Sequence, residues 1–102
     1  MSVIMTLRVE GDGAAAEKLA ADDPTIFMNV VAKAKELGLI SHHFYASDQE
    51  ILVVDEWPSS EAFQTFFHDS GPAIQQIMSS VGVTSEPVIT FWRKLATGDD
   101  VG

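Results

Sequence analysis

Apolar residues recur along the chain with two spacings, one typical of strands and the other typical of helices. Short runs rich in β-branched and aromatic residues predict four strands, at residues 2–9, 41–47, 50–57 and 87–95. Between them, helix-forming or helically spaced segments predict helices at residues 14–21, 24–37, 60–68 and 73–82. Each half of the chain therefore has the order strand, helix, strand, and each of the two helical regions is interrupted once.

Local signals mark where these helices begin and end. Asp23 is a candidate N-cap, and Pro24 suits the first helical position because the N–H that proline lacks has no helical partner there. Gly38 is a natural C-terminal stop for the same helix. Ser59 or Ser60 can cap the next helical segment.

The order βαββαβ is that of the split βαβ, ferredoxin-like arrangement. This is an α+β fold, with a four-stranded antiparallel sheet whose right-handed crossovers put the helices on one face. We expect a single such domain at residues 1–96, followed by a flexible tail at residues 97–102.

The predicted strands are apolar on both faces, which bears on assembly. In the first strand, Met5 and Leu7 on one face oppose Ile4 on the other. A sheet with one face in water alternates more cleanly between apolar and polar residues. We therefore expect the face without helices to be covered by a second copy of the chain, which makes a homodimer.

The amino-acid composition limits which other classes of molecule the protein can bind. Six Lys and Arg against 15 Asp and Glu give a formal charge of −9, the opposite of what phosphate neutralisation requires, so we expect no nucleic acid and no membrane partner. The chain has no cysteine, which excludes disulfides and thiolate nucleophiles. Its start lacks the regions of a signal peptide, and no stretch approaches the roughly 20 apolar residues of a membrane span. These features predict a soluble, unprocessed, cytoplasmic protein.

The second and third strands carry the candidate catalytic residues. With a two-residue turn at residues 48–49, antiparallel pairing places His42 opposite Asp55, on the same face as Trp57. A three-residue loop slips the register by one and places His43 there instead. A carboxylate beside an imidazole holds one tautomer, as a general base for a phenol or an acidic C–H requires. The sequence leaves open whether the pair is catalytic or an ion pair at the edge of the sheet.

Neighbouring histidines also raise the question of a metal ion. Adjacent residues in a strand point to opposite faces, so His42 and His43 are poorly placed to bind one ion. We therefore expect no metal site.

The stretch EILVVDEWPSSEAFQTFF, preceded by GLISHHFYASDQ, resembles the dimeric α/β-barrel proteins grouped with the antibiotic biosynthesis monooxygenases. In that family the third strand ends in a Trp before a Ser-containing, Glu-Ala-Phe helix start. The resemblance in strand order covers the whole chain, and the motif covers about residues 38–67. It implies a dimer in which two sheets form a barrel, and a pocket in each chain between sheet and helices. Trp57 then either lines this pocket or fills the core at the end of its strand.

The same resemblance bears on cofactors. The family includes cofactor-independent oxygenases of polycyclic phenols, haem-degrading enzymes and isomerase-like proteins. Where the haem-degrading branch has an Asn on the first strand, this chain has Thr6 or a neighbour. Where that branch has an iron-ligating His, this chain has about Ile77. We therefore expect no haem and no other cofactor.

The remaining candidates are substrate-binding side chains near the same corner. Phe63, Phe66 and Phe67 share one helical face, which is typical of a core, and we expect at most one of them, Phe67, to touch a ligand. Tyr45 is a polar candidate on the second strand. His68 projects away from the phenylalanine stripe, which favours a solvated side chain. The sequence also leaves open the alternative that the nearby helix break turns His68 toward a cleft.

These observations predict a monooxygenase-like protein that acts without a cofactor on a small aromatic or polyketide-like molecule. An anion formed by a base reacts with oxygen in a dry apolar pocket, so this chemistry needs few characteristic residues. One alternative is an isomerase or cyclase that uses the same histidine and carboxylate. Another is a non-catalytic binding dimer in which His42, His43 and Asp55 are dispensable.

Overall fold

The computed structural model describes residues 2–102, in which four strands and four helices follow one another in the predicted order. These are β1 (Val3–Glu10), α1 (Gly13–Asp22), α2 (Pro24–Glu36), β2 (Ser41–Ala46), β3 (Glu50–Trp57), α3 (Ser60–Asp69), α4 (Gly71–Ser80) and β4 (Val88–Trp92). The helices come in two consecutive pairs, as the predicted interruptions require. None of them is long and apolar enough to cross a membrane.

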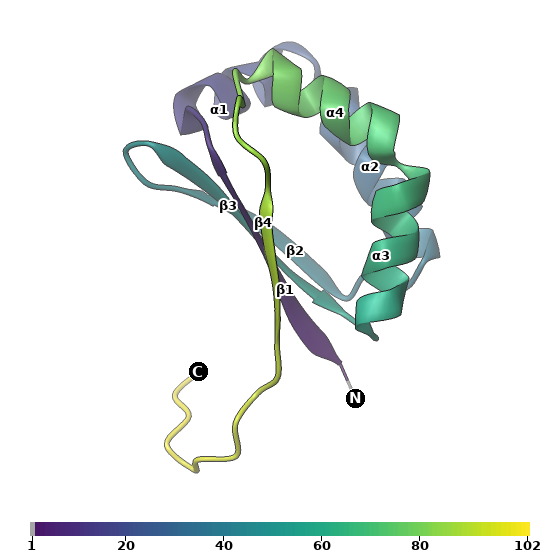
Figure 1. Cartoon of the computed structure of the whole chain (residues 1–102), viewed down its shortest axis with the longest axis vertical. Coiled ribbons are helices and arrows are strands. Elements are labelled where there is room, and N and C mark those ends of the chain that lie inside the picture. Colours follow the sequence, from purple (N-terminus) through teal and green to yellow (C-terminus); the bar gives the residue numbers. More distant parts are fainter. Residues whose placement is uncertain (1) are drawn as a thin grey trace.

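The four strands form one antiparallel sheet in the order β2-β3-β1-β4. Figure 1 shows the helices gathered on one side of this sheet, with α3 and α4 following one another in an arc. The predicted ferredoxin-like fold is confirmed. β4 ends at Trp92, earlier than predicted, because its partner Ile4 is already close to the beginning of β1. Residues 93–102 follow as exposed chain without regular structure.

Two capping predictions have different outcomes. Ser59, and not Ser60, is the N-cap of α3, where its hydroxyl accepts a hydrogen bond from the backbone N–H of Ala62 at 3.2 Å. Asp23 occupies the N-cap position of α2, but its carboxylate makes no capping bond to the backbone. The carboxylate of Asp23 accepts a hydrogen bond from the hydroxyl of Thr25 at 2.8 Å instead. The Thr25 hydroxyl therefore takes the place of a backbone N–H donor.

Gly38 ends the α2 region with a backbone φ of +100°, which L side chains rarely adopt. A Cβ atom at this position would lie 2.9 Å from Cγ of Pro58. Pro58 directly follows the end of β3, so this glycine lets the chain pass close to the corner where β3 turns into α3.

The core lies between the helices and one face of the sheet. The fully or nearly fully buried residues on the two central strands are Met5, Leu7, Val9, Ile51, Asp55 and Trp57, and the partly buried Val53 completes the alternation in β3. Phe63 and Phe66 reach this layer from α3. The alternation of side chains along each strand therefore divides the sheet into a face that the helices cover and a face that they do not cover.

No helix among residues 2–102 lies on the opposite face of the sheet (Figure 1). Leu52 and Val54 lie near its middle, and Trp92 lies at one side, where its indole N–H donates to the hydroxyl of Thr6 at 2.8 Å. We call this the open face. Thr6 and Arg8 of β1 pair with Val54 and Leu52, so the open face mixes polar and apolar side chains, and its apolar part corresponds to the two-sided apolar pattern of the sequence.

Candidate functional site

The β2–β3 hairpin has the register predicted for a two-residue turn. The backbone N–H of Ser47 donates to the carbonyl of Glu50 at 2.9 Å, which closes the turn at residues 48–49. His42 therefore stands opposite Asp55, and Phe44 stands opposite Val53. Because the register is this one, His42 rather than His43 faces the helices.

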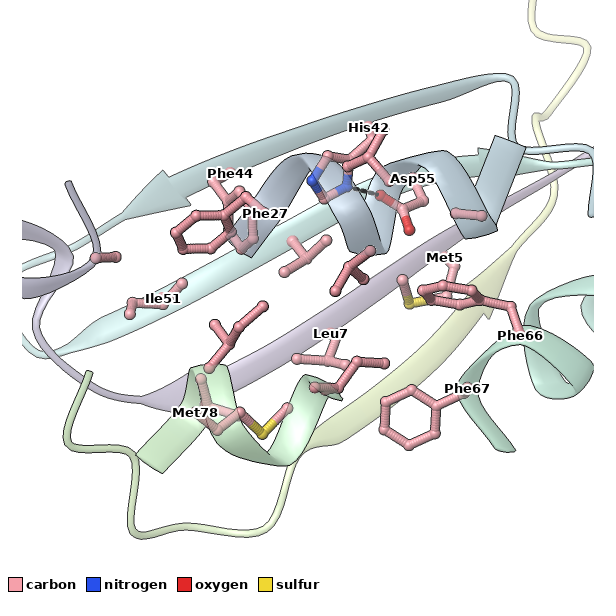
Figure 2. Close-up of a pocket in the computed structure, with 18 of the residues that line it drawn as sticks. Met5, Leu7, Phe27, His42, Phe44, Ile51, Asp55, Phe66, Phe67 and Met78 are labelled. Carbon is pink, nitrogen blue, oxygen red and sulfur yellow. Dashed lines mark hydrogen bonds and ion pairs between the residues drawn. The ribbon is translucent and has the colours of Figure 1, made fainter. Parts of the chain in front are cut away.

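His42 and Asp55 form a hydrogen-bonded pair on this face. Nδ1 of His42 lies 2.7 Å from Oδ1 of Asp55 (Figure 2). The side chain of Asp55 is only 6% exposed and that of His42 is 23% exposed. An ionised carboxylate only accepts hydrogen bonds, so Nδ1 carries the proton and Nε2 of the neutral ring keeps a free lone pair. Such an arrangement can act chemically as an oriented general base.

The second oxygen of Asp55 is held from another direction. The indole N–H of Trp57 donates to Oδ2 of Asp55 at 3.1 Å. Trp57 itself is 0% exposed and packs against Phe63 and Phe66, with ring centroids 5.7 and 5.3 Å apart. It does not line the cavity described below. Of the two roles left open for Trp57, the structure places it in the core, where it also orients the carboxylate.

A cavity of about 120 Å³ lies between the sheet and the helices. Figure 2 shows most of its lining residues, which come from the sheet and from the helices packed on it. His42 and Asp55 are the polar residues of the lining, and every other lining side chain is apolar. Phe67 is among them and stacks on Phe63, with ring centroids 5.4 Å apart. The imidazole is thus the basic group of an otherwise apolar chamber.

The cavity approaches the surface beside the edge strand β2. Phe44 lines it and is nevertheless 47% exposed. Its ring makes edge contacts with His42, at a centroid distance of 4.8 Å, and with Phe27 of α2, at 5.5 Å. We call Phe27 and Phe44 the mouth pair, because they stand where the cavity is nearest to solvent.

Three candidates lie elsewhere. His43 and Tyr45 are on the open face, opposite Val54 and Leu52, because successive strand residues alternate between faces. The side chain of His68 is 90% exposed at the end of α3, 3.3 Å from the carboxylate of Asp69. These residues are therefore separated from the cavity. Within residues 2–102, no three His, Cys, Asp or Glu side chains come together in a group that could hold a metal ion.

Several wall residues were not candidates from the sequence, among them Phe27, Phe44, Ile77 and Met78. Their helical or strand periodicity predicts that they face the interior. Periodicity does not distinguish a wall of a cavity from a filled core, because that difference depends on how the side chains fit together.

The sequence matches no family model and no curated protein. Solved structures match in fold. A proposed antibiotic biosynthesis monooxygenase of Deinococcus radiodurans is 17% identical, with a TM-score of 0.66, over 98% of this chain and 99% of that one. The ActVA-Orf6 monooxygenase of Streptomyces coelicolor, solved with nanaomycin D, is 20% identical, with a TM-score of 0.66, over 93% and 89%.

A third structure is SnoaB, described as a cofactor-independent oxygenase from Streptomyces nogalater. It is 18% identical, with a TM-score of 0.61, over 94% of this chain and 97% of that one. Identities this low carry information on the fold, and the coverage extends over nearly the whole chain in each case. The chain therefore has the ferredoxin-like fold of proteins described as antibiotic biosynthesis monooxygenases.

Proposed function

We propose that this protein is a cofactor-independent monooxygenase that acts on a small aromatic molecule bound in the cavity. The observation that carries the proposal is the His42–Asp55 pair in the wall of an otherwise apolar chamber. An apolar pocket with a few convergent polar groups is the usual form of a small-molecule site. The names of the solved structures with this fold support the type of reaction.

His42 begins the reaction as a general base. Nε2 takes a proton from a phenol or an acidic C–H of the substrate, and the imidazolium that results donates Nδ1–H to Asp55. Asp55 stabilises this cation, and Trp57 holds the other carboxylate oxygen in place. His42 thus moves the proton, Asp55 orients the imidazole, and Trp57 orients the carboxylate.

The apolar walls favour the oxygen step. Excluding water keeps the substrate anion weakly solvated and electron-rich, so that it can reduce molecular oxygen. At an activated CH₂ carbon, one oxygen atom replaces two hydrogens as a carbonyl and the other leaves as water. The substrate supplies the electrons, and for that reason the reaction needs no bound redox group.

The proposal includes a homodimer. The open face presents apolar side chains of Leu52, Val54 and Trp92 that no helix of the same chain covers (Figure 1). Pairing the open faces of two copies removes this surface from water and encloses the two sheets between outer layers of helices. The cavity lies on the other side of the sheet, so each copy keeps its own site.

Oxygen consumption tests the proposed function directly. Purified protein in buffer containing a chelator is given a panel of phenols, naphthols and hydroxyanthrones under ¹⁸O₂. We expect oxygen uptake with one of these classes and one ¹⁸O atom in the product. A product formed equally well under nitrogen supports an isomerase or cyclase instead, and binding without any product supports a ligand-binding protein.

A further inference from the structure

We infer that the ligand of this cavity is a compact molecule of about one aromatic ring, with a hydrogen-bond donor at one end and an apolar opposite end. The inference rests on the proposed function only for the assumption that the cavity is the binding site. It is carried by the volume of the cavity and by where its polar atoms lie.

The volume limits the ligand to about one ring. The cavity measures about 120 Å³, and an apolar protein cavity of about 150 Å³ binds benzene. A molecule of three fused rings therefore has to extend past the mouth pair into solvent or move the helices away from the sheet. A single substituted ring fits with small adjustments, such as rotation of the flexible side chain of Met78.

The polar end of the cavity accepts a hydrogen bond. Both carboxylate oxygens of Asp55 already receive donors, from His42 and Trp57. The free group is Nε2 of His42, which in the neutral ring is an acceptor. A ligand group placed against it must donate, so a hydroxyl fits better than a carbonyl or an ether.

The rest of the cavity offers no hydrogen-bonding side chain. In Figure 2, His42 and Asp55 lie on one side of the lining residues, and Met78 and Phe67 lie across from them. A second hydroxyl at the far end of the ligand would be buried without a partner. An unpaired buried hydroxyl weakens binding by about fivefold or more, so polyoxygenated rings are disfavoured.

Three ligands of nearly equal size test both ends of the cavity. They are 4-methylphenol, toluene, which lacks the hydroxyl, and hydroquinone, which has a hydroxyl in place of the methyl group. Calorimetry under nitrogen measures binding to the wild-type protein without oxidation. We expect 4-methylphenol to bind about threefold to tenfold more tightly than toluene. We expect it to bind more tightly than hydroquinone by a factor of about five or more.

A variant that combines His42→Phe with Asp55→Leu tests the polar end, because His42→Phe alone removes Nε2 but leaves Oδ1 of Asp55 free to accept from the ligand. We expect the preference to reverse, so that toluene binds this variant more tightly than 4-methylphenol. The comparison of ligands in the wild-type protein stands even if this variant does not fold. The inference is overturned if toluene or hydroquinone binds the wild-type protein as tightly as 4-methylphenol does. It is also overturned if none of the three ligands binds.

Larger probes separate this inference from the proposed function. If the tricyclic 1,8-dihydroxyanthrone binds more tightly than 4-methylphenol and is oxygenated, the ligand class is wrong and the proposed function stands. If 4-methylphenol binds as expected but no member of the phenol, naphthol and hydroxyanthrone panel consumes oxygen, the ligand class stands and the monooxygenase is wrong.

Discussion

Trp57 and Asp55 are joined by a buried hydrogen bond, 3.1 Å from the indole nitrogen to Oδ2. The two residues lie two positions apart on the helix-covered face of β3, so their side chains are neighbours. The other carboxylate oxygen, Oδ1, meets His42 at 2.7 Å. Trp57 thus acts on the candidate base from outside the cavity, by fixing the carboxylate that fixes the imidazole.

The first prediction separates this hydrogen bond from the packing of the tryptophan. Trp57→Phe keeps an aromatic ring in the core but leaves Oδ2 of Asp55 without its donor. We expect the free energy of unfolding to fall by about 1–3 kcal/mol, as for the loss of a hydrogen bond to a charged group, with a further loss for the smaller ring. We also expect a larger share of His42 in the Nε2–H tautomer, measured by ¹⁵N NMR.

Trp92→Phe is the matched control. It also removes an indole N–H that donates to a side-chain oxygen, that of Thr6, but on the open face and without contact to Asp55. The His42 tautomer should not change in this variant. An unchanged tautomer in Trp57→Phe as well would mean that the tryptophan only fills the core.

The second prediction concerns the mouth pair. Phe44→Ala removes one of the two rings where the cavity is nearest to solvent, so ligand exchange should become faster and larger ligands should enter. Because Phe44 is 47% exposed, the loss of stability should be well below the about 3–5 kcal/mol typical of a buried phenylalanine. Stopped-flow measurement of association and dissociation of 4-methylphenol checks the rates.

Tyr45→Ala provides the comparison for that variant, since Tyr45 is the next residue of β2 and lies on the open face. It should leave both rate constants unchanged within about twofold. Equal rates in Phe44→Ala and wild type would show that ligands enter by another route.

The third prediction tests the close approach at the end of α2. Gly38→Ala combines an unfavourable φ of +100° with a Cβ only 2.9 Å from Pro58, whereas Gly82→Ala has a positive φ of +75° and open space around it. Both variants should lose stability, by about 1 kcal/mol or more, and Gly38→Ala should lose more. Denaturant unfolding of both variants measures the difference, and equal losses would mean that the contact with Pro58 relaxes at no cost.

The fourth prediction concerns assembly. At micromolar concentration the protein should sediment at about 22 kDa, twice the 11.1 kDa of one chain. Val54→Lys places a charge in the middle of the open face and should produce monomers. Met28→Lys adds the same charge at an exposed position of α2 and should leave the dimer intact. A compact wild-type monomer, or a Val54→Lys dimer as stable as wild type, contradicts the proposed arrangement.

The sequence predicts the fold and the histidine–carboxylate pair for the same physical reason. Strand alternation and turn length together determine which residues face each other, so the sequence limits the partner of Asp55 to His42 or His43, and the two-residue turn of the structure selects His42. The same alternation excludes His43 and Tyr45 from the cavity once the register is known.

Other parts of the site depend on side-chain geometry that periodicity does not contain. The bond between Trp57 and Asp55 requires a particular rotamer of each residue, and only the shared face was predictable. The cavity exists because the side chains of α2, α4 and the sheet do not completely fill the space between them. An apolar stripe has the same pattern over a filled core.

The two neighbouring histidines of β2 give the most direct test of the catalytic proposal. His42 contacts Asp55 beside the cavity, and His43 points from the same strand to the open face. The measurement is the rate of oxygen consumption by His42→Gln and His43→Gln with the substrate that wild-type protein oxygenates best. Loss of a general base lowers a rate by about 10²–10⁴-fold. We predict a loss of that size in His42→Gln and a rate within about twofold of wild type in His43→Gln, whereas an undiminished rate in His42→Gln, or equal losses in both variants, would contradict the assignment of His42 as the base.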